Sequence, residues 1–219
     1  MLSDITLKFL KDLQKNNNKT WFENNRKTYQ LIKEDFLVLT QQIIDGIAIF
    51  DLPVGHLKAK DCTFRINRDV RFSKNKSPYK NNVGAYFNYE GKKGNGAGYY
   101  LHIEPGKSFA AGGIWMPEPQ VLSKIRQEID YSFNQLNRIT SAAAFKKTFL
   151  LGITGEALVR PPKGYDDQNP AIALLKLKSF IVSRSFSDAE LKNKNFTKSV
   201  VQTFKTMQPF INFLNTAIQ

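Results

Sequence analysis

Hydrophobic residues recur at helical spacing through the first third of the chain. The stripe from Phe22 to Ile47 advances by three, four or seven residues at a time, which is typical of an amphipathic helix with one buried face. Thr20 and Glu23 stand at the spacing of a capping box and predict that this long helix begins near Thr20. A shorter helix is expected before it, ending at the asparagine run 16–18.

The middle of the chain changes to a period of two. Apolar and polar side chains alternate in residues 62–68, 83–89 and 98–104, and a less regular stretch follows at 107–116. Such alternation predicts antiparallel strands with one buried and one polar face. The glycine-rich segment 91–98 is expected to form a hairpin loop, because strands rather than a strand and a helix flank it. In this phase the polar face carries Arg65, Tyr86, Tyr100, His102 and Glu104.

The last third is predicted to be mainly helical, with a strand-like alternation at 180–186 and a final helix from about Thr197 that Pro209 should kink or split. We therefore expect one α+β domain over residues 1–219, in which the N- and C-terminal helices pack on a central antiparallel sheet. The sheet would consist of the stretches at 62–68, 83–89, 98–104 and 107–116. The residues expected to be buried are Phe36, Phe64, Ile66, Phe87, Leu101, Ile103 and Phe204.

Composition adds a strong positive charge. The chain has 32 Lys and Arg against 19 Asp and Glu, a net charge of +13, which favours anionic partners without choosing among them. Cys62 is the one cysteine, so an internal disulfide is excluded. The N-terminal residues lack a signal-peptide pattern and no apolar run is long enough to span a bilayer. These features predict a soluble, cytoplasmic protein without membrane contact.

The densest charge lies between Phe64 and Lys80, where a single acid, Asp69, stands among six cations. Arginine suits phosphate and carboxylate groups because its planar fork binds them bidentately. The alternative is a solvated loop with scattered ion pairs, and Arg71 has Asp69 as a candidate partner. The residues predicted to bind an anionic ligand here are Arg65, Arg68, Arg71, Lys76, Tyr79 and Lys80.

His102 and Glu104 are two residues apart on a predicted strand, so their side chains point to the same face. They are candidates for a general acid/base pair, or for a hydrogen-bonded polar pair without chemistry. A metal site is not expected, because no third ligand is evident and the other histidine, His56, lies outside the strands. No cofactor is implied.

Three further groups are candidate ligand contacts. Tyr100 shares the polar face with His102, and Trp115 follows a Gly-Gly pair that would let backbone approach a ligand. Arg160 and Lys163 belong to a stiff, basic Arg-Pro-Pro-Lys-Gly turn that can form a second arm of the same site. The alternative for Trp115 is a buried tryptophan on a bulged strand, and the alternative for the basic turn is a rigid connector.

Four motifs resemble one known family. The run F-R-I-x-R-D-x-R-F-S-x-x-K-x-P-Y-K at 64–80 is similar to the signature of domain-of-unknown-function family 2461, and the motifs H-I-E-P-G, G-G-x-W-x-P and R-P-P-K-G-Y follow in the same order. The resemblance covers nearly the whole chain and implies a single α+β domain without an established activity. Asn169 stands before Pro170 where many members of the family carry histidine, so any role of that histidine is absent here.

Three functions remain open from the sequence. The first is an enzyme or binding protein for a small phosphorylated or carboxylated molecule, held on the polar sheet face. The second is a nucleic-acid-binding module, which charge and interleaved aromatic residues favour although no helix-turn-helix, RNP or zinc-finger pattern occurs. The third is a scaffold protein whose basic surface only aids solubility. The position of the basic residues, in a concave cluster or on an exposed stripe, discriminates between them.

Overall fold

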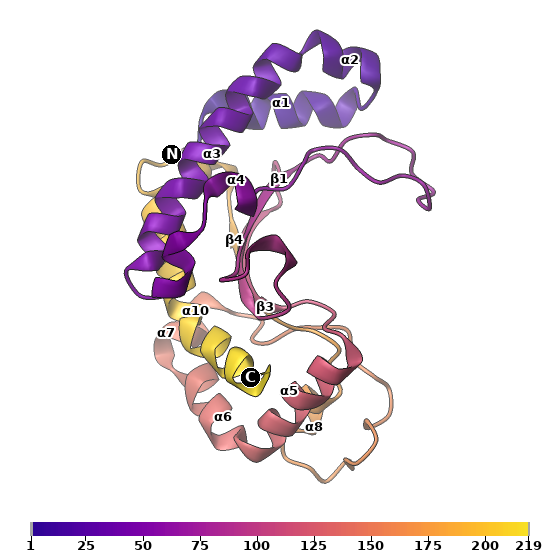
Figure 1. Ribbon diagram of the computed structural model, residues 1–219, viewed down its shortest axis with the longest axis vertical. Coiled ribbons are helices and arrows are strands. Elements are labelled where there is room, and N and C mark those ends of the chain that lie inside the picture. The colour runs from indigo at the N-terminus through magenta and orange to yellow at the C-terminus, as the bar shows by residue number, and fades with distance from the viewer. Residues whose placement is uncertain (1, 219) are drawn as a thin grey trace.

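The computed structural model describes residues 2–218 and contains a four-stranded antiparallel sheet with helices against one of its faces (Figure 1). The strand order is β1-β2-β3-β4, and Tyr100 of β2 lies opposite Tyr86 of β1 and Ala111 of β3. The predicted α+β class is confirmed. The strands are β1 (Val83–Phe87), β2 (Gly98–Ile103), β3 (Ser108–Ile114) and β4 (Phe180–Phe186).

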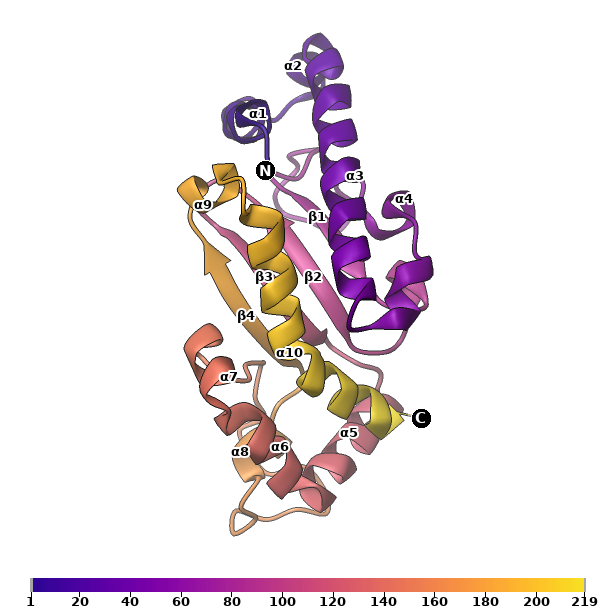
Figure 2. The same ribbon diagram turned by 90° about the vertical axis from the view of Figure 1, so that its left-hand side faces the viewer.

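Two long helices, α3 (Arg26–Ala48) and α10 (Phe196–Ile218), lie across one face of the sheet (Figure 2). The opposite face is not covered by either helix, and Figure 1 shows it on the inner side of a C-shaped outline. Shorter elements complete the fold. They are α1 (Asp4–Lys15), α2 (Lys19–Asn24), η1 (Leu52–His56), α4 (Ala59–Cys62), η2 (Gly91–Lys93), α5 (Pro119–Tyr131), α6 (Phe133–Ser141), α7 (Ala143–Thr148), α8 (Ile172–Leu175) and α9 (Asp188–Lys192).

The buried hydrophobic residues form one contiguous cluster between the sheet and the helices. Six of the seven predicted core residues are buried, and Leu101, Ile103 and Phe204 are fully inaccessible. Phe64 is the exception, with 40% of its surface exposed. The alternation was therefore interpreted in the right phase for β1 and β2. In the segment that contains Phe64, Ile66 is buried as predicted and Phe64 departs from the pattern.

The prediction of a strand at residues 62–68 is wrong. Helix α4 ends at Cys62, and the chain then makes only isolated bridges, from Thr63 to Ala85 and from Asn67 to Tyr79. The fourth strand of the sheet is instead β4, which pairs with β3 along its whole length. Alternation alone could not choose between the two segments, because a strand is defined by its partner as well as by its pattern.

The N-terminal helices also differ from the prediction. The Asn18 side chain accepts a hydrogen bond from the Trp21 amide and caps α2, so the helix does not begin at the Thr20–Glu23 pair. Asn25 then separates α2 from α3, which begins at Arg26. At the other terminus α10 runs through Pro209 without being split.

Candidate functional site

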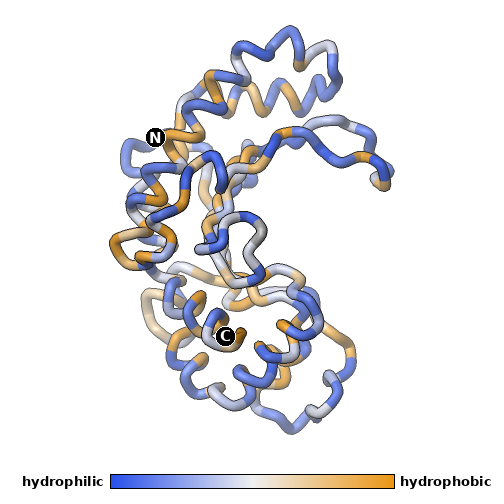
Figure 3. Tube along the Cα trace, in the orientation of Figure 1, coloured by the Kyte–Doolittle hydropathy of each residue, from blue (hydrophilic) through white to orange (hydrophobic). Residues whose placement is uncertain are grey.

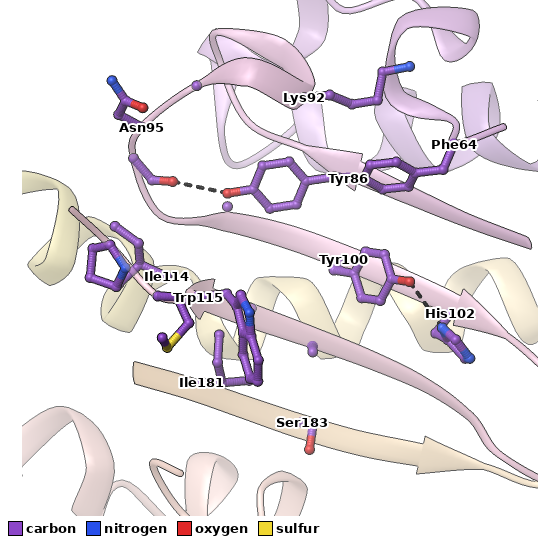
Figure 4. A pocket seen from close by; sticks show the side chains of 18 of the residues that line it. Phe64, Tyr86, Lys92, Asn95, Tyr100, His102, Ile114, Trp115, Ile181 and Ser183 are labelled. Atoms are coloured by element: carbon purple, nitrogen blue, oxygen red, sulfur yellow. Dashed lines mark hydrogen bonds between the residues drawn. The ribbon is translucent and has the colours of Figure 1, made fainter. Parts of the chain in front are cut away.

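A large cavity lies over the uncovered face of the sheet (Figure 4). Its volume is about 1580 Å³, which exceeds the usual size of a pocket for a small ligand. Side chains that alternate with the core residues form its floor, because successive residues of a strand point to opposite faces. These floor residues are Tyr86, Tyr100, His102, Phe109, Ala111, Ile181 and Ser183.

Three residues at alternate positions of β2 and its end form a hydrogen-bonded chain. The Tyr100 hydroxyl lies 3.0 Å from His102 Nδ1, and His102 Nε2 lies 2.9 Å from Glu104 Oε2. The Phe109 ring stacks on the imidazole at a centroid distance of 4.7 Å and an interplanar angle of 14°. The His102 ring is thus held in one orientation from three sides.

The direction of these hydrogen bonds follows from the carboxylate. An ionised Glu104 can only accept, so His102 Nε2 donates to it. In the neutral ring Nδ1 is then an acceptor, and the Tyr100 hydroxyl donates to it. Burial and the nearby Glu104 charge raise the pKa of Tyr100, which keeps the hydroxyl protonated. The arrangement can carry a proton between the cavity floor and Glu104.

Three cations line the cavity. They are Arg68, Lys80 and Lys92, together with Phe64 and with Asp69, whose carboxylate is paired with Arg71. The ammonium groups of Lys80 and Lys92 lie 5.4 Å and 5.9 Å from the centroid of the Phe64 ring, at cation–π distance. Phe64 also meets Tyr100 edge to face at 6.2 Å, so it links the cations to the floor.

The three cations differ in how they are held. The Arg68 guanidinium donates to the carbonyl of Ser77 and to the Ser73 hydroxyl, and Lys92 Nζ donates to the carbonyl of Thr63 at 2.6 Å. Within residues 2–218, Lys80 Nζ has neither a hydrogen-bond acceptor nor an ion-pair partner. Burial lowers the pKa of Lys80, and the charge of Arg65 lowers it further. Lys80 is therefore the cation whose charge is least compensated.

One end of the cavity is formed by the turn after β3. Trp115, Met116 and Pro117 line it, with Ile114 and the start of α5 beside them. Figure 4 shows Trp115 over Ile181, at the end of the sheet face away from His102. The cavity is therefore lined by cations around the Phe64 ring and by an indole at the turn after β3.

The family model described as "conserved hypothetical protein (DUF2461)" matches residues 5–213 of the chain. The chain belongs to the DUF2461 family. The resemblance seen in the sequence motifs is thereby confirmed. No curated protein and no solved structure matches the chain.

The cavity of this DUF2461 protein brings together only part of the predicted site. Glu104 is not a lining residue but is bonded to His102. Five predicted residues line the cavity, and six lie elsewhere. The lining residues are Arg68, Lys80, Tyr100, His102 and Trp115, and the others are Arg65, Arg71, Lys76, Tyr79, Arg160 and Lys163.

Most of the residues outside the cavity have other partners or are exposed. Arg71 forms a bidentate pair with Asp69, and Lys76 Nζ donates to the Val70 carbonyl, within a mostly hydrophilic loop (Figure 3). Tyr79 is buried and stacks on Phe22 at 4.0 Å, as part of the N-terminal packing. Arg65 is exposed; its predicted place on the sheet face rested on the strand that does not form.

Arg160 and Lys163 are exposed in the connection that leads to α8. Asn169, at the position of the family departure, donates a hydrogen bond to Asp130 at 2.6 Å. Neither the basic turn nor Asn169 lines the cavity.

Sequence reasoning missed several lining residues. Lys92 was assigned only to a flexible hairpin, Phe109 lay in the strand without a clear pattern, and Phe64 was assigned to the core. A signal existed for Phe109, because it pairs with His102 once the hairpin register is fixed. None existed for Lys92, whose position depends on how the loop folds back over Thr63.

Neither a cluster of metal ligands nor a membrane-spanning helix is present in the part of the chain that the structure describes. No three His, Cys, Asp or Glu side chains within residues 2–218 are gathered as a metal site requires. Over the same residues, none of the helices combines the length and the apolar character needed to cross a bilayer.

Proposed function

We propose that this protein binds a phosphorylated or carboxylated molecule in the cavity over the open sheet face, as an enzyme or as a binding protein. The observation that carries the proposal is that Arg68, Lys80 and Lys92 line one large aromatic-lined cavity, with Lys80 and Lys92 against the same Phe64 ring and Asp69 as the carboxylate near Arg68 in the sequence. A concave cluster of this kind favours a bound ligand over a merely solubilising surface.

The charge of Lys80 is unfavourable in the absence of an anion. Its charge is partly desolvated and near Arg65, which is why its pKa is lowered. A bound anion would remove this cost, since an opposite charge at short range favours the charged form of the ammonium. Lys80 and Lys92 both lie against the Phe64 ring, so their ammonium groups border the same part of the cavity.

His102 and Glu104 take the acid/base role in this proposal. The Tyr100 hydroxyl lies on the cavity floor and His102 connects it to Glu104. When the Tyr100 oxygen takes a proton from a ligand, its own hydroxyl proton can pass to His102 Nδ1, and Glu104 then stabilises the imidazolium that forms.

Calorimetric titration with inorganic pyrophosphate tests the proposal. A charge-assisted hydrogen bond contributes about 1.5–3 kcal/mol, so Lys80→Gln should weaken pyrophosphate binding by about 10- to 150-fold. Lys92→Gln should also weaken it. Lys33→Gln changes an exposed lysine on α3, behind the sheet, and should leave the affinity unchanged.

Equal affinity of the wild type, Lys80→Gln and Lys33→Gln proteins would contradict the proposed site. Absence of pyrophosphate binding to the wild type would contradict the anion-binding function itself. Circular dichroism of each variant shows whether the fold is intact.

A further inference from the structure

Trp115 is 75% exposed although it lines the cavity and points toward the space above the sheet (Figure 4). A tryptophan contributes most to stability when its large apolar surface is buried. The turn that carries Trp115 is also conformationally unusual. Met116 has φ +44°, a conformation that is uncommon for any residue except glycine, and its amide donates to Ser179 Oγ at 2.9 Å.

Gly113 adds to this geometry. Its φ of +129° is open to glycine, and a Cβ there would overlap the carbonyl oxygen of Phe180. Gly113, two positions before Trp115, and Met116, directly after it, both have positive φ. A non-glycine residue in this region is frequently found at a functional site, and this turn carries the indole that lines the cavity.

Two side-chain amides also line the cavity, Gln120 at the start of α5 and Asn95 in the loop between β1 and β2. Within residues 2–218 neither amide is hydrogen-bonded to another protein group. An amide offers both donors and an acceptor, which suits the edge of a heteroaromatic ring. Glu118 lies at the same end as Trp115, so this end disfavours a phosphate group.

The cavity extends along the whole of β3. Phe109, which stacks on His102, and Trp115 are six positions apart in and after this strand, or at most about 20 Å at the rise of a strand. The cavity is therefore longer than one phosphate ion. The rings of Tyr86 and Tyr100 also line it, so flat groups are accommodated on its floor.

We infer that the cavity binds a ligand that contains a nucleoside phosphate. Its base would stack on Trp115, and its phosphate groups would be directed to Lys80, Lys92 and Arg68. This inference rests on the proposed anion-binding function and adds the class of ligand. The same chemistry occurs in a free nucleotide and in a single strand of nucleic acid, since both combine flat bases with phosphates.

Fluorescence tests the inference directly. Trp21→Phe leaves Trp115 as the one tryptophan of a chain that has two. Adenosine diphosphate should quench its emission, whereas pyrophosphate should bind without a comparable change. Loss of one stacked base typically weakens binding by about 5- to 150-fold, so Trp115→Ala should lower affinity for adenosine diphosphate by that factor and spare pyrophosphate.

The control is Tyr131→Ala, which removes another exposed aromatic side chain outside the cavity; it should change neither affinity. Titration with an oligothymidylate shows whether the ligand is a free nucleotide or a single strand of nucleic acid. Tighter binding than adenosine diphosphate indicates a single strand, weaker binding indicates a free nucleotide, and either result with the Trp115→Ala loss supports the inference. Equal affinity of the wild type and Trp115→Ala for both nucleotide ligands, with pyrophosphate still bound, would overturn it. If pyrophosphate also failed to bind the wild type, the proposed anion-binding function itself would be contradicted.

Discussion

The protonation pattern of His102 is determined by its two partners. Glu104 accepts from Nε2, and the Tyr100 hydroxyl donates to Nδ1. Sequence spacing predicted that His102 and Glu104 share a face, because residues two apart on a strand point the same way. Tyr100 was predicted on the same face. The stacking of Phe109 on the imidazole required the register between β2 and β3.

Nitrogen NMR of the imidazole checks this pattern. A neutral His102 ring should be the Nε2–H tautomer. Glu104→Ala removes the acceptor, so the ring should then populate both tautomers. His56, which is exposed, serves as an internal comparison. A predominant Nδ1–H form of His102 in the wild type would contradict the assigned direction of the hydrogen bonds.

The lowered pKa of Lys80 predicts a dependence of stability on pH. The ordinary value for lysine is 10.5, and a lowered value means that the folded state binds this proton less tightly than the unfolded state. As the pH rises from the folded-state value toward 10.5, the unfavourable charge is lost and folding becomes more favourable. The wild type should therefore gain stability relative to Lys80→Gln over this range.

Urea unfolding in anion-free buffer, from pH 7 to pH 10, measures this difference in the free energy of unfolding. Lys33→Gln provides the comparison for a lysine on the helical side of the molecule. A wild type that loses stability relative to Lys80→Gln as the pH rises would show that the sign is wrong.

Among the helices and strands, the sequence pattern predicted those features that depend on neighbouring residues alone. The phase of β1 and β2 followed from alternation, because one face had to be buried against helices. The segment after Cys62 has the same alternation, yet it lies at the edge of the sheet and folds back on itself through Asn67 and Tyr79. Strand β4, which pairs with β3, lies about 70 residues further along the chain, and no local pattern specifies so distant a pairing.

Gly113 gives a test at this scale. Gly113→Ala should destabilise the protein by the cost of its backbone conformation, about 1–3 kcal/mol, and by the overlap with the Phe180 carbonyl. Gly106→Ala is the matched control, since Gly106 also has positive φ but open space around it. Urea unfolding should give the larger loss for Gly113→Ala, and equal losses would contradict the described packing of β3 on β4.

At the scale of the whole molecule, the charge of +13 predicted an anionic partner but could not locate it. The cavity combines residues from 64–121 with two from β4. Only the folded chain shows that Lys92 belongs to the site while Arg71 is paired with Asp69. The organisation as one domain stays a prediction, which the contiguous core favours.

Chemical-shift mapping of the isotope-labelled protein during titration with pyrophosphate tests whether the cavity is the anion site, because it locates the bound anion without assuming which residues bind it. We expect the largest shifts at Lys80, Lys92 and the cavity-facing residues Tyr100 and His102, with little change on α3 or α10. The largest shifts at Arg160 and Lys163, or along the exposed loop around Arg71, would show that the anion binds elsewhere and that the cavity is not its site.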